Sequence, residues 1–170
     1  TLAACLAFGV ALLPAQQSAT PTERPRLVVL CVVDQLASWV FAQAEPHFAP
    51  DGGFRRLLGS GAEFPACAYR HACSETGPGH ATIGTGAPAR AHGIVRNAWW
   101  SEADNRVVYC AEDAVPPLPE WPEGKLRGPG KLLVPTFAST LKAHVPGSRA
   151  VSVAWKDRSA ILMGGIDADL

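Results

Sequence analysis

The sequence lacks an excess of either charge, with 15 Lys and Arg residues against 15 Asp and Glu residues. A strong excess of one sign is what draws a protein to nucleic acid or to a charged membrane surface. We therefore expect no nucleic-acid partner. Any site for an anion must instead be built locally from a few side chains.

The sequence also lacks an apolar run long enough to cross a bilayer. Residues 2–13 are almost continuously apolar but too short to span, and they suit the hydrophobic region of a secretory signal. The alternative is a buried first helix. We predict a signal peptide over residues 1–19, incomplete at its start because Thr1 is preceded by no Met or basic leader, and a linker over residues 20–26. The mature protein would be periplasmic or extracellular, without stable membrane association.

No two cysteines have the CxxC spacing, so we expect no cysteine-based zinc site. Export would place Cys31, Cys67, Cys73 and Cys110 in an oxidising compartment, where four cysteines allow three disulfide pairings. Alternatively, they are small buried hydrophobic residues. The sequence leaves both possibilities open.

The sequence has no internal repeat and no low-complexity tract, and 48% of its residues are hydrophobic, which is enough for a core. Residues 27–33 form an unbroken β-branched run, typical of a central strand buried on both faces. Further strands are predicted at residues 63–69 and 150–155, and helices at residues 54–58 and 135–144. This alternation predicts an α/β fold with a mostly parallel central sheet flanked by helices.

Other segments are predicted to lie at the periphery of this fold. We expect a loop at residues 90–100, a short strand of a peripheral hairpin at 106–110, and an irregular Pro- and Gly-rich insertion at 114–135. A further element begins at residues 161–165.

The stretch TGPGHATIGTG, residues 76–86, predicts a tight turn that leads into a short helix. Gly77 and Gly79 permit backbone angles closed to other residues, and Pro78 suits a first helical turn. The unpaired amides and partial positive charge of a helix N-terminus favour an anion such as phosphate. Thr76 is then either a nucleophile or the N-cap of the helix, and both readings remain open.

Polar side chains follow two of the predicted strands. Asp34 ends the run 27–33, while Lys156 and Arg158 emerge from 150–155. The carboxyl ends of parallel strands meet at one edge of the sheet, where ligands collect. A carboxylate and a hydroxyl suit a divalent metal, and a Lys–Arg pair suits phosphate or sulfate oxygens. A structural cap at Asp34 and a solvated loop pair at Lys156 and Arg158 are the alternatives.

Four segments in order, VVLCVVDQL, TGPGHATIGTG, AHGIVRN and WKDRSAILMGG, resemble the alkaline phosphatase superfamily. The resemblance is closest to the branch with a threonine nucleophile and folds like those of type I phosphodiesterases and nucleotide pyrophosphatases. It covers the chain from about residue 26 to its end. It implies that residues 27–170 are the N-terminal part of an alkaline phosphatase-like catalytic domain, incomplete at its C-terminus.

The resemblance assigns roles to five residues. It implies that Asp34 is a zinc ligand, that Thr76 is both nucleophile and zinc ligand, and that Asn97 donates to a phosphoryl oxygen. Lys156 and Arg158 look like the pair that contacts the substrate phosphate in monoesterase members and that diesterase relatives typically lack. The implied reaction is hydrolysis of a small phosphate monoester with two zinc ions, through a phosphothreonine intermediate.

Two histidines also match the motifs of the resemblance. We interpret His80 and His92 as structural supports rather than ligands. The resemblance further implies that the backbone amide of Gly77 helps to hold the phosphoryl oxygens.

One departure from the pattern concerns the metal ligands. Family members complete both zinc sites with Asp and His residues from later motifs, whereas the only histidine in residues 101–170 is His144. We expect the remaining ligands beyond residue 170, and we expect the 170-residue chain alone to be inactive and to bind zinc weakly. The alternatives are a phosphodiesterase or nucleotide pyrophosphatase of the same fold and a non-catalytic relative that serves as a binding module. A sulfatase is disfavoured, because Thr76 lacks the CxPxR-type context.

Overall fold

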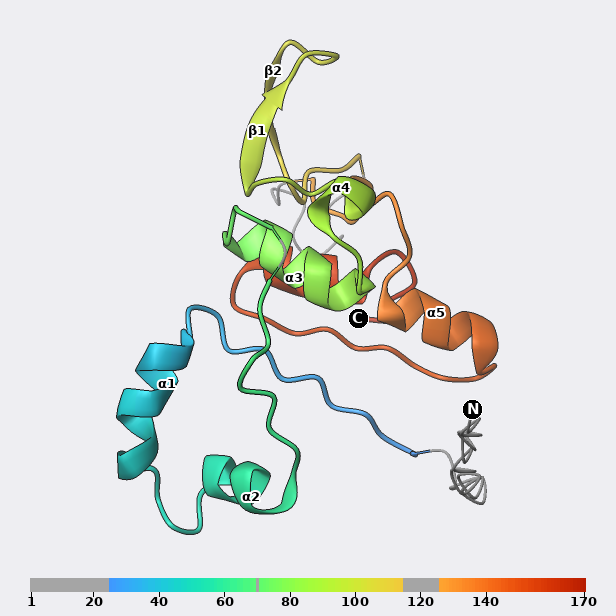
Figure 1. Cartoon of the computed structure of the whole chain (residues 1–170). Helices are drawn as coiled ribbons and strands as arrows, with labels where there is room; N and C mark the ends of the chain where they lie inside the picture. Colours follow the sequence, from blue (N-terminus) through green and yellow to red (C-terminus); the bar gives the residue numbers. More distant parts are fainter. Residues whose placement is uncertain (1–24, 70, 115–125) are drawn as a thin grey trace, which may run out of the picture. The chain divides into compact units, whose positions relative to one another are not determined.

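The computed structural model describes residues 25–69, 71–114 and 126–170. The helices are α1 (Ser38–Ala44), α2 (Gly53–Ser60), α3 (Thr76–Thr85), α4 (Ala89–His92), α5 (Phe137–His144) and α6 (Asp157–Gly164), with a 3-10 helix η1 (Glu45–His47) and strands β1 (Ala98–Ser101) and β2 (Arg106–Tyr109) (Figure 1). The chain divides into two compact units, residues 1–36 and 37–170. The predicted signal peptide and most of the linker lie outside the described residues.

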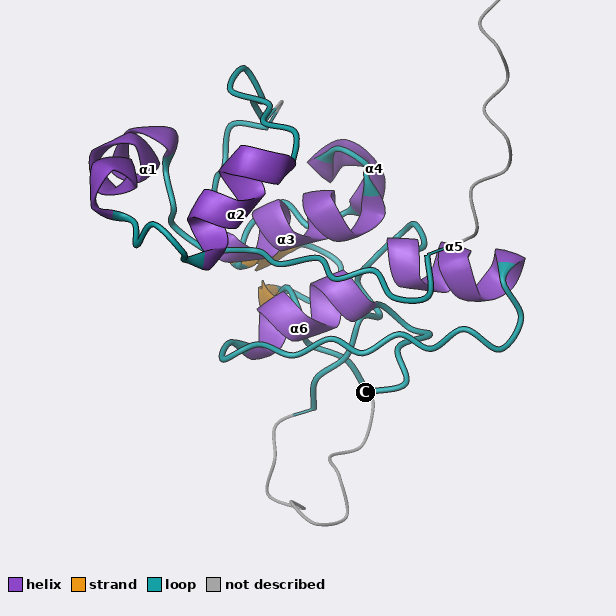
Figure 2. Ribbon diagram, turned by 90° about the horizontal axis from the view of Figure 1, so that it is seen from below, coloured by secondary structure: helices purple, strands orange, loops and turns teal. Residues whose placement is uncertain are grey.

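Helices α3 and α6 form the centre of the second unit, and Figure 2 shows them packed against each other. A Cβ atom at Gly84 would lie 2.6 Å from the carbonyl oxygen of Leu162, so the two helices cross where α3 carries no side chain. The buried cluster around this crossing consists of Ala81, Ile94, Cys110, Ala111 and Leu162. The crossing fixes how the start of α6 lies relative to the start of α3.

The three predicted helices are present, and local signals set their ends. Helix α3 ends at Gly86, whose φ of +67° is left-handed and whose amide donates to the Thr82 carbonyl at 2.9 Å. Helix α5 starts after Thr136, whose Oγ1 accepts from the Ser139 amide at 3.3 Å. The same hydroxyl donates to the Gly164 carbonyl at 2.9 Å, which ties the start of α5 to the end of α6.

The predicted peripheral hairpin is also present. Strand β2 pairs antiparallel with β1, with Trp99 opposite Val108. Strand β1 and the short helix α4 both occupy parts of the segment 90–100 that the sequence predicted as loop. The described end of the Pro- and Gly-rich insertion is irregular, as predicted, apart from an isolated bridge between Glu112 and Arg127. Residues 115–125 of the insertion lie outside the described residues.

The predicted strands at residues 27–33, 63–69 and 150–155 are wrong for this structure, because none of these segments forms a strand. Segment 150–155 makes two backbone hydrogen bonds with the end of the chain, from the Ser152 amide to the Leu170 carbonyl and from the Asp169 amide to the Ala150 carbonyl, both at 2.7 Å. The three segments run without regular structure, and their apolar side chains are exposed, for example by 76% at Val29 and 83% at Val153. A strand requires a neighbour that completes its ladder of hydrogen bonds. Within the described ranges the one sheet is β1–β2, so the predicted parallel central sheet is not formed there.

Several elements were not anticipated. Helix α1 and η1 carry no expectation from the sequence, and α6 begins at Asp157, earlier than the element predicted at 161. The four described cysteines are free, and only Cys110 among them is buried. The interpretation as a small buried hydrophobic residue therefore applies to Cys110. Across the described ranges, every helix is too short or too polar to cross a membrane.

Candidate functional site

The N-terminus of α3 presents Thr76 as the first helical residue. Glu75 is the N-cap, and its carbonyl accepts the first helical hydrogen bond from the Gly79 amide at 3.1 Å. The N-cap interpretation of Thr76 is therefore wrong, because a residue inside the first turn is not the cap. The half-buried Thr76 hydroxyl instead stands at the positive end of the helix dipole.

Lys156 meets Thr76 at this point. It is the N-cap of α6, it is half-buried, and its Nζ donates to Thr76 Oγ1 over a long distance of 3.5 Å. The two residues are 80 positions apart in the sequence. The packing of α3 on α6 thus brings together two of the predicted site residues and places the starts of both helices side by side.

Asn97 lies against the same turn of α3. Its side-chain Oδ1 accepts from the Gly77 amide at 2.7 Å. A Cβ atom at Gly77 would lie 3.0 Å from this oxygen and 3.0 Å from Cys110 Sγ, so the approach depends on glycine. The Gly77 amide, expected to hold a phosphoryl oxygen, is bonded to Asn97 instead. Because Oδ1 is the acceptor, Nδ2 is the end of the Asn97 amide that can donate to a ligand.

Hydrogen bonds to Glu75 hold Asn97 at the start of α3. Glu75 Oε2 accepts from the Asn97 amide at 2.7 Å, and its Oε1 accepts from Arg96 Nη2 at 2.7 Å and Nε at 3.0 Å. The Asn97 amide and then the Arg96 guanidinium hold the pKa of Glu75 below its usual value, so the Glu75 carboxylate stays ionised. Sequence reasoning missed Glu75, although its place directly before the helix was the available signal.

Arg158 is held in a network with Tyr109, Asp157 and Arg127. Arg158 Nη1 donates to the Tyr109 hydroxyl at 3.1 Å, and that hydroxyl donates to Asp157 Oδ1 at 2.7 Å. Arg127 Nε donates to Asp157 Oδ2 at 2.8 Å. Arg158 Nε is buried and has no hydrogen-bond partner among the described residues.

Burial and hydrogen bonding oppose each other in this network. Burial acts to raise the pKa of Asp157, but hydrogen bonds from Tyr109, the Arg158 amide and Arg127 outweigh it and lower that pKa. Burial, followed by the bond to Asp157, raises the pKa of Tyr109. Burial also raises the pKa of the Cys110 thiol to about 11. At neutral pH the network therefore contains the Asp157 carboxylate and the neutral Tyr109 phenol, and the nearby Cys110 thiol is also neutral.

The two motif histidines are bonded within the scaffold. His80 Nδ1 donates to the Thr76 carbonyl at 2.8 Å. The fully buried His92 accepts at Nδ1 from the Ile94 amide at 3.1 Å, so its protonated Nε2 donates to Thr82 Oγ1 at 3.1 Å. Burial and then the nearby His71 lower the pKa of His92. These contacts fit the interpretation of both histidines as structural supports.

Asp34, the predicted zinc ligand, lies in a turn at the end of the first unit. No group of three or more His, Cys, Asp or Glu residues in the described ranges could hold a metal ion. Zinc sites in proteins use three or four protein ligands. One carboxylate and one hydroxyl do not reach that number, so the described residues alone do not form a zinc site.

Comparison with known proteins identifies the family. The profile of the type I phosphodiesterase / nucleotide pyrophosphatase family matches residues 28–165, which is most of the chain. The chain therefore belongs to this family.

Individual relatives carry alkaline phosphatase names. The chain is 40% identical to alkaline phosphatase PhoK of a Sphingomonas species over 89% of its own length and 27% of the relative's. It is 37% identical to alkaline phosphatase PhoD of Zymomonas mobilis, over 85% of the chain and 25% of the relative. It thus spans about a quarter of the length of the curated relatives that it matches.

A solved structure shares the fold. The crystal structure of alkaline phosphatase PafA superimposes with a TM-score of 0.70 at 27% identity, covering 79% of this chain and 26% of PafA. This similarity shows an alkaline phosphatase-like fold.

Proposed function

We propose that this chain is the N-terminal part of an exported, zinc-dependent phosphatase that hydrolyses small phosphate monoesters through a phosphothreonine intermediate. The observation that carries the proposal is the meeting of Lys156 Nζ with Thr76 Oγ1, 3.5 Å apart, where α3 and α6 both begin. A nucleophilic hydroxyl and a cation at two helix starts suit a reaction on a phosphoryl group.

The electrostatics favour a dianion. Each helix N-terminus contributes a partial positive charge, and the Lys156 ammonium adds a full one. Arg158, one residue inside α6, adds a second full charge. A phosphate monoester carries up to two negative charges near neutral pH and a diester carries one, so this concentration of positive charge favours the monoester.

Three side chains besides Thr76 have roles in the proposed reaction. Thr76 Oγ attacks phosphorus, the bond from phosphorus to the leaving oxygen breaks, and water later hydrolyses the phosphothreonine. Lys156, beside the hydroxyl, stabilises its alkoxide form. Asn97 Nδ2, Lys156 and Arg158 then hold the phosphoryl oxygens as charge shifts among them.

Zinc belongs to the proposal through two residues of this chain. Asp34 and Thr76 would be ligands, and the others would come from beyond residue 170 of a longer protein, of which the chain spans about a quarter by comparison with its relatives. Bound zinc would lower the pKa of the Thr76 hydroxyl and so make it a stronger nucleophile.

The test uses the full reading frame, expressed with zinc. We expect kcat/KM for an aryl phosphate monoester to exceed that for the matching diester. Replacing both Lys156 and Arg158 by alanine should lower the monoester value on the order of a thousandfold and the diester value far less, because each charged donor stabilises the transition state. Thr76→Ala serves as the reference for loss of the nucleophile. A diester preference that is insensitive to the double substitution would overturn the proposal.

The second candidate is a phosphodiesterase or nucleotide pyrophosphatase, because the matching family profile carries that description. The same measurement distinguishes it. A non-catalytic relative would be indicated if the full reading frame also lacked the remaining zinc ligands and hydrolysed neither ester.

A further inference from the structure

Tyr109, at the end of β2, connects the hairpin to the start of α6. Its hydroxyl accepts from Arg158 Nη1 at 3.1 Å and donates to Asp157 Oδ1 at 2.7 Å. A phenol has one donor and can accept, so both functions of this hydroxyl have partners here. The Arg158 side chain is long and flexible, and within the described ranges its guanidinium hydrogen-bonds to the Tyr109 hydroxyl.

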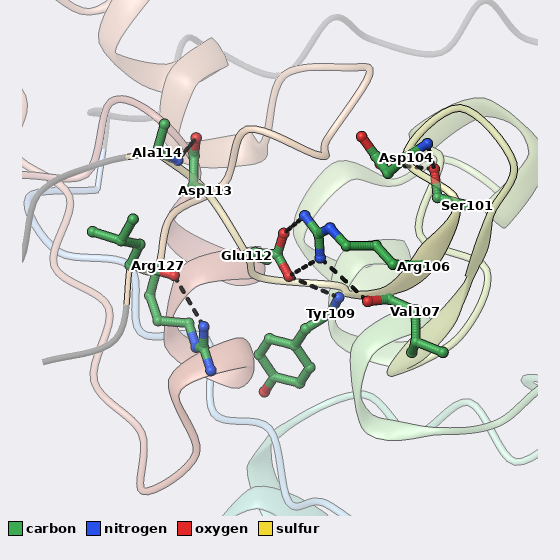
Figure 3. A network of polar contacts seen from close by, with 10 residues as sticks. Ser101, Asp104, Arg106, Val107, Tyr109, Glu112, Asp113, Ala114 and Arg127 are labelled. Carbon is green, nitrogen blue, oxygen red and sulfur yellow. Dashed lines mark hydrogen bonds and ion pairs between the residues drawn. The ribbon is translucent and has the colours of Figure 1, made fainter.

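The Tyr109 ring is itself held from the other side. The Arg127 guanidinium carbon lies 4.6 Å from the ring centroid, and Figure 3 shows the two side chains next to each other. Arg127 also forms a salt bridge with Asp157 at 2.8 Å, so the Tyr109 ring, the Asp157 carboxylate and the Arg127 guanidinium all contact one another. Backbone bonds fix Arg127, through its bridge to Glu112 and the Gly128 amide, which donates to the Ala111 carbonyl at 3.1 Å.

These contacts hold the Arg158 guanidinium from one side only. Nη1 is committed to Tyr109, whereas Nε is buried and has no partner within the described residues. An arginine that is already fixed before it meets a ligand loses less conformational freedom when it binds.

We propose that Tyr109 is a positioning residue, whose hydroxyl holds Arg158 in the orientation that receives the substrate phosphate. The inference rests on the proposed function, which assigns Arg158 to that phosphate. Tyr109 acts through Arg158 and does not itself touch the reacting atoms. Asp157 and Arg127 keep the Tyr109 hydroxyl directed toward Arg158.

Tyr109→Phe isolates the hydroxyl, because the ring and its contact with Arg127 remain. The change should lower kcat/KM for the monoester about tenfold, the effect of one hydrogen bond to a charged group. The diester should be affected far less, since it depends less on the Lys–Arg pair. Inorganic phosphate should inhibit about tenfold more weakly, because Arg158 is no longer fixed before binding.

The decisive experiment is a double-mutant cycle in the full reading frame with zinc, using Tyr109→Phe, Arg158→Ala and both together. If Tyr109 acts through Arg158, then adding Tyr109→Phe to Arg158→Ala lowers the monoester kcat/KM no further. The matched control is Tyr69→Phe, at the chain's other tyrosine, which is 57% exposed and should leave activity unchanged.

Three outcomes overturn the inference, and they are distinguishable. If Arg158→Ala lowers monoester hydrolysis strongly but Tyr109→Phe has no effect, or the two effects multiply independently, then Tyr109 does not position Arg158 although the proposed function stands. If Arg158→Ala leaves monoester hydrolysis unchanged, the proposed function fails and the inference fails with it. An equal loss on monoester and diester, with a lower melting temperature, would indicate a purely structural tyrosine.

Discussion

Single side chains in this protein combine packing with a defined protonation state. His92 is fully buried, accepts from the Ile94 amide and donates to Thr82 Oγ1. Only the neutral imidazole can make both bonds, because the charged ring has no acceptor nitrogen. The fold of the α3–α4 region therefore depends on an uncharged histidine directly behind the Thr76 turn.

This dependence predicts a pH effect on stability. Because the pKa of His92 is lowered in the folded protein, the unfolded chain takes up a proton at a higher pH than the folded one. The stabilisation is fully present above the unfolded pKa of about 6.5 and is lost as the pH falls toward the lowered folded pKa, by at most about 1.4 kcal/mol per pH unit. Urea unfolding of the full-length protein at a series of pH values would show this loss.

The matched substitutions are His92→Gln and His144→Gln. His92→Gln should be less stable at neutral pH and should show a smaller loss toward acid, whereas the exposed His144 should leave the slope as in the wild type. An unchanged acid slope in His92→Gln would show that other groups cause the pH dependence.

At the scale of elements, the crossing of α3 and α6 determines the site. Thr76 and Lys156 are the first residue of α3 and the N-cap of α6, so their 3.5 Å contact depends on how the helices cross. The crossing depends in turn on Gly84, where even a Cβ atom would come within 2.6 Å of the Leu162 carbonyl. The contact between Thr76 and Lys156 in the proposed site thus depends on a small residue two turns away.

We therefore predict that Gly84→Ala separates the two helices. It should cost about 1–3 kcal/mol of unfolding free energy, the usual range for overpacking, and it should lower monoester kcat/KM by moving Lys156 away from Thr76. Gly59→Ala is the control, because a Cβ atom there would have nothing within 4 Å and the residue lies in α2. It should be neutral or slightly stabilising, since alanine favours helix over glycine. Wild-type stability in Gly84→Ala would contradict the close crossing.

At the scale of the whole molecule, the chain carries apolar segments that the described residues do not cover. Val153 is 83% exposed and Trp155 fully exposed, and Leu27 in the first unit is 78% exposed. The zinc ligands of the proposed site are likewise incomplete in the described part of the chain. Both features agree with a chain that spans about a quarter of the length of its relatives.

We predict that the 170-residue chain alone binds zinc weakly and hydrolyses no phosphate ester. Isothermal titration should detect no tight stoichiometric site in it, and two in the full reading frame, because zinc requires three or four protein ligands for each ion. The full reading frame with Asp34→Ala should lose affinity at one of them. A tight site in the 170-residue chain, abolished by Asp34→Ala and Thr76→Ala together, would show that the ligand set is complete without later residues.

Local sequence is enough to predict the features that depend on neighbours a few positions away. The segment 76–86 predicted a helix, and α3 forms there with Pro78 in its first turn. The predicted tight turn before the helix is absent, because Gly77 and Gly79 lie inside α3 and neither has a left-handed φ. The segment 135–144 predicted α5, which Thr136 caps through its own side chain. The ordered motifs also carried the family resemblance, which the family profile confirms.

Which distant groups meet depends on the packing of segments that are far apart in the sequence. The hydrogen bond from Arg96 to Glu75 joins residues 21 positions apart, and the hydrogen bond from Arg158 to Tyr109 joins residues 49 positions apart. Nothing in the local pattern of either residue names its partner. The apolar runs at 27–33 and 150–155 are not strands in this structure for the same reason, because a strand forms only where another segment supplies a continuous ladder of hydrogen bonds. Local chemistry set the helix ends, and packing between segments set the site.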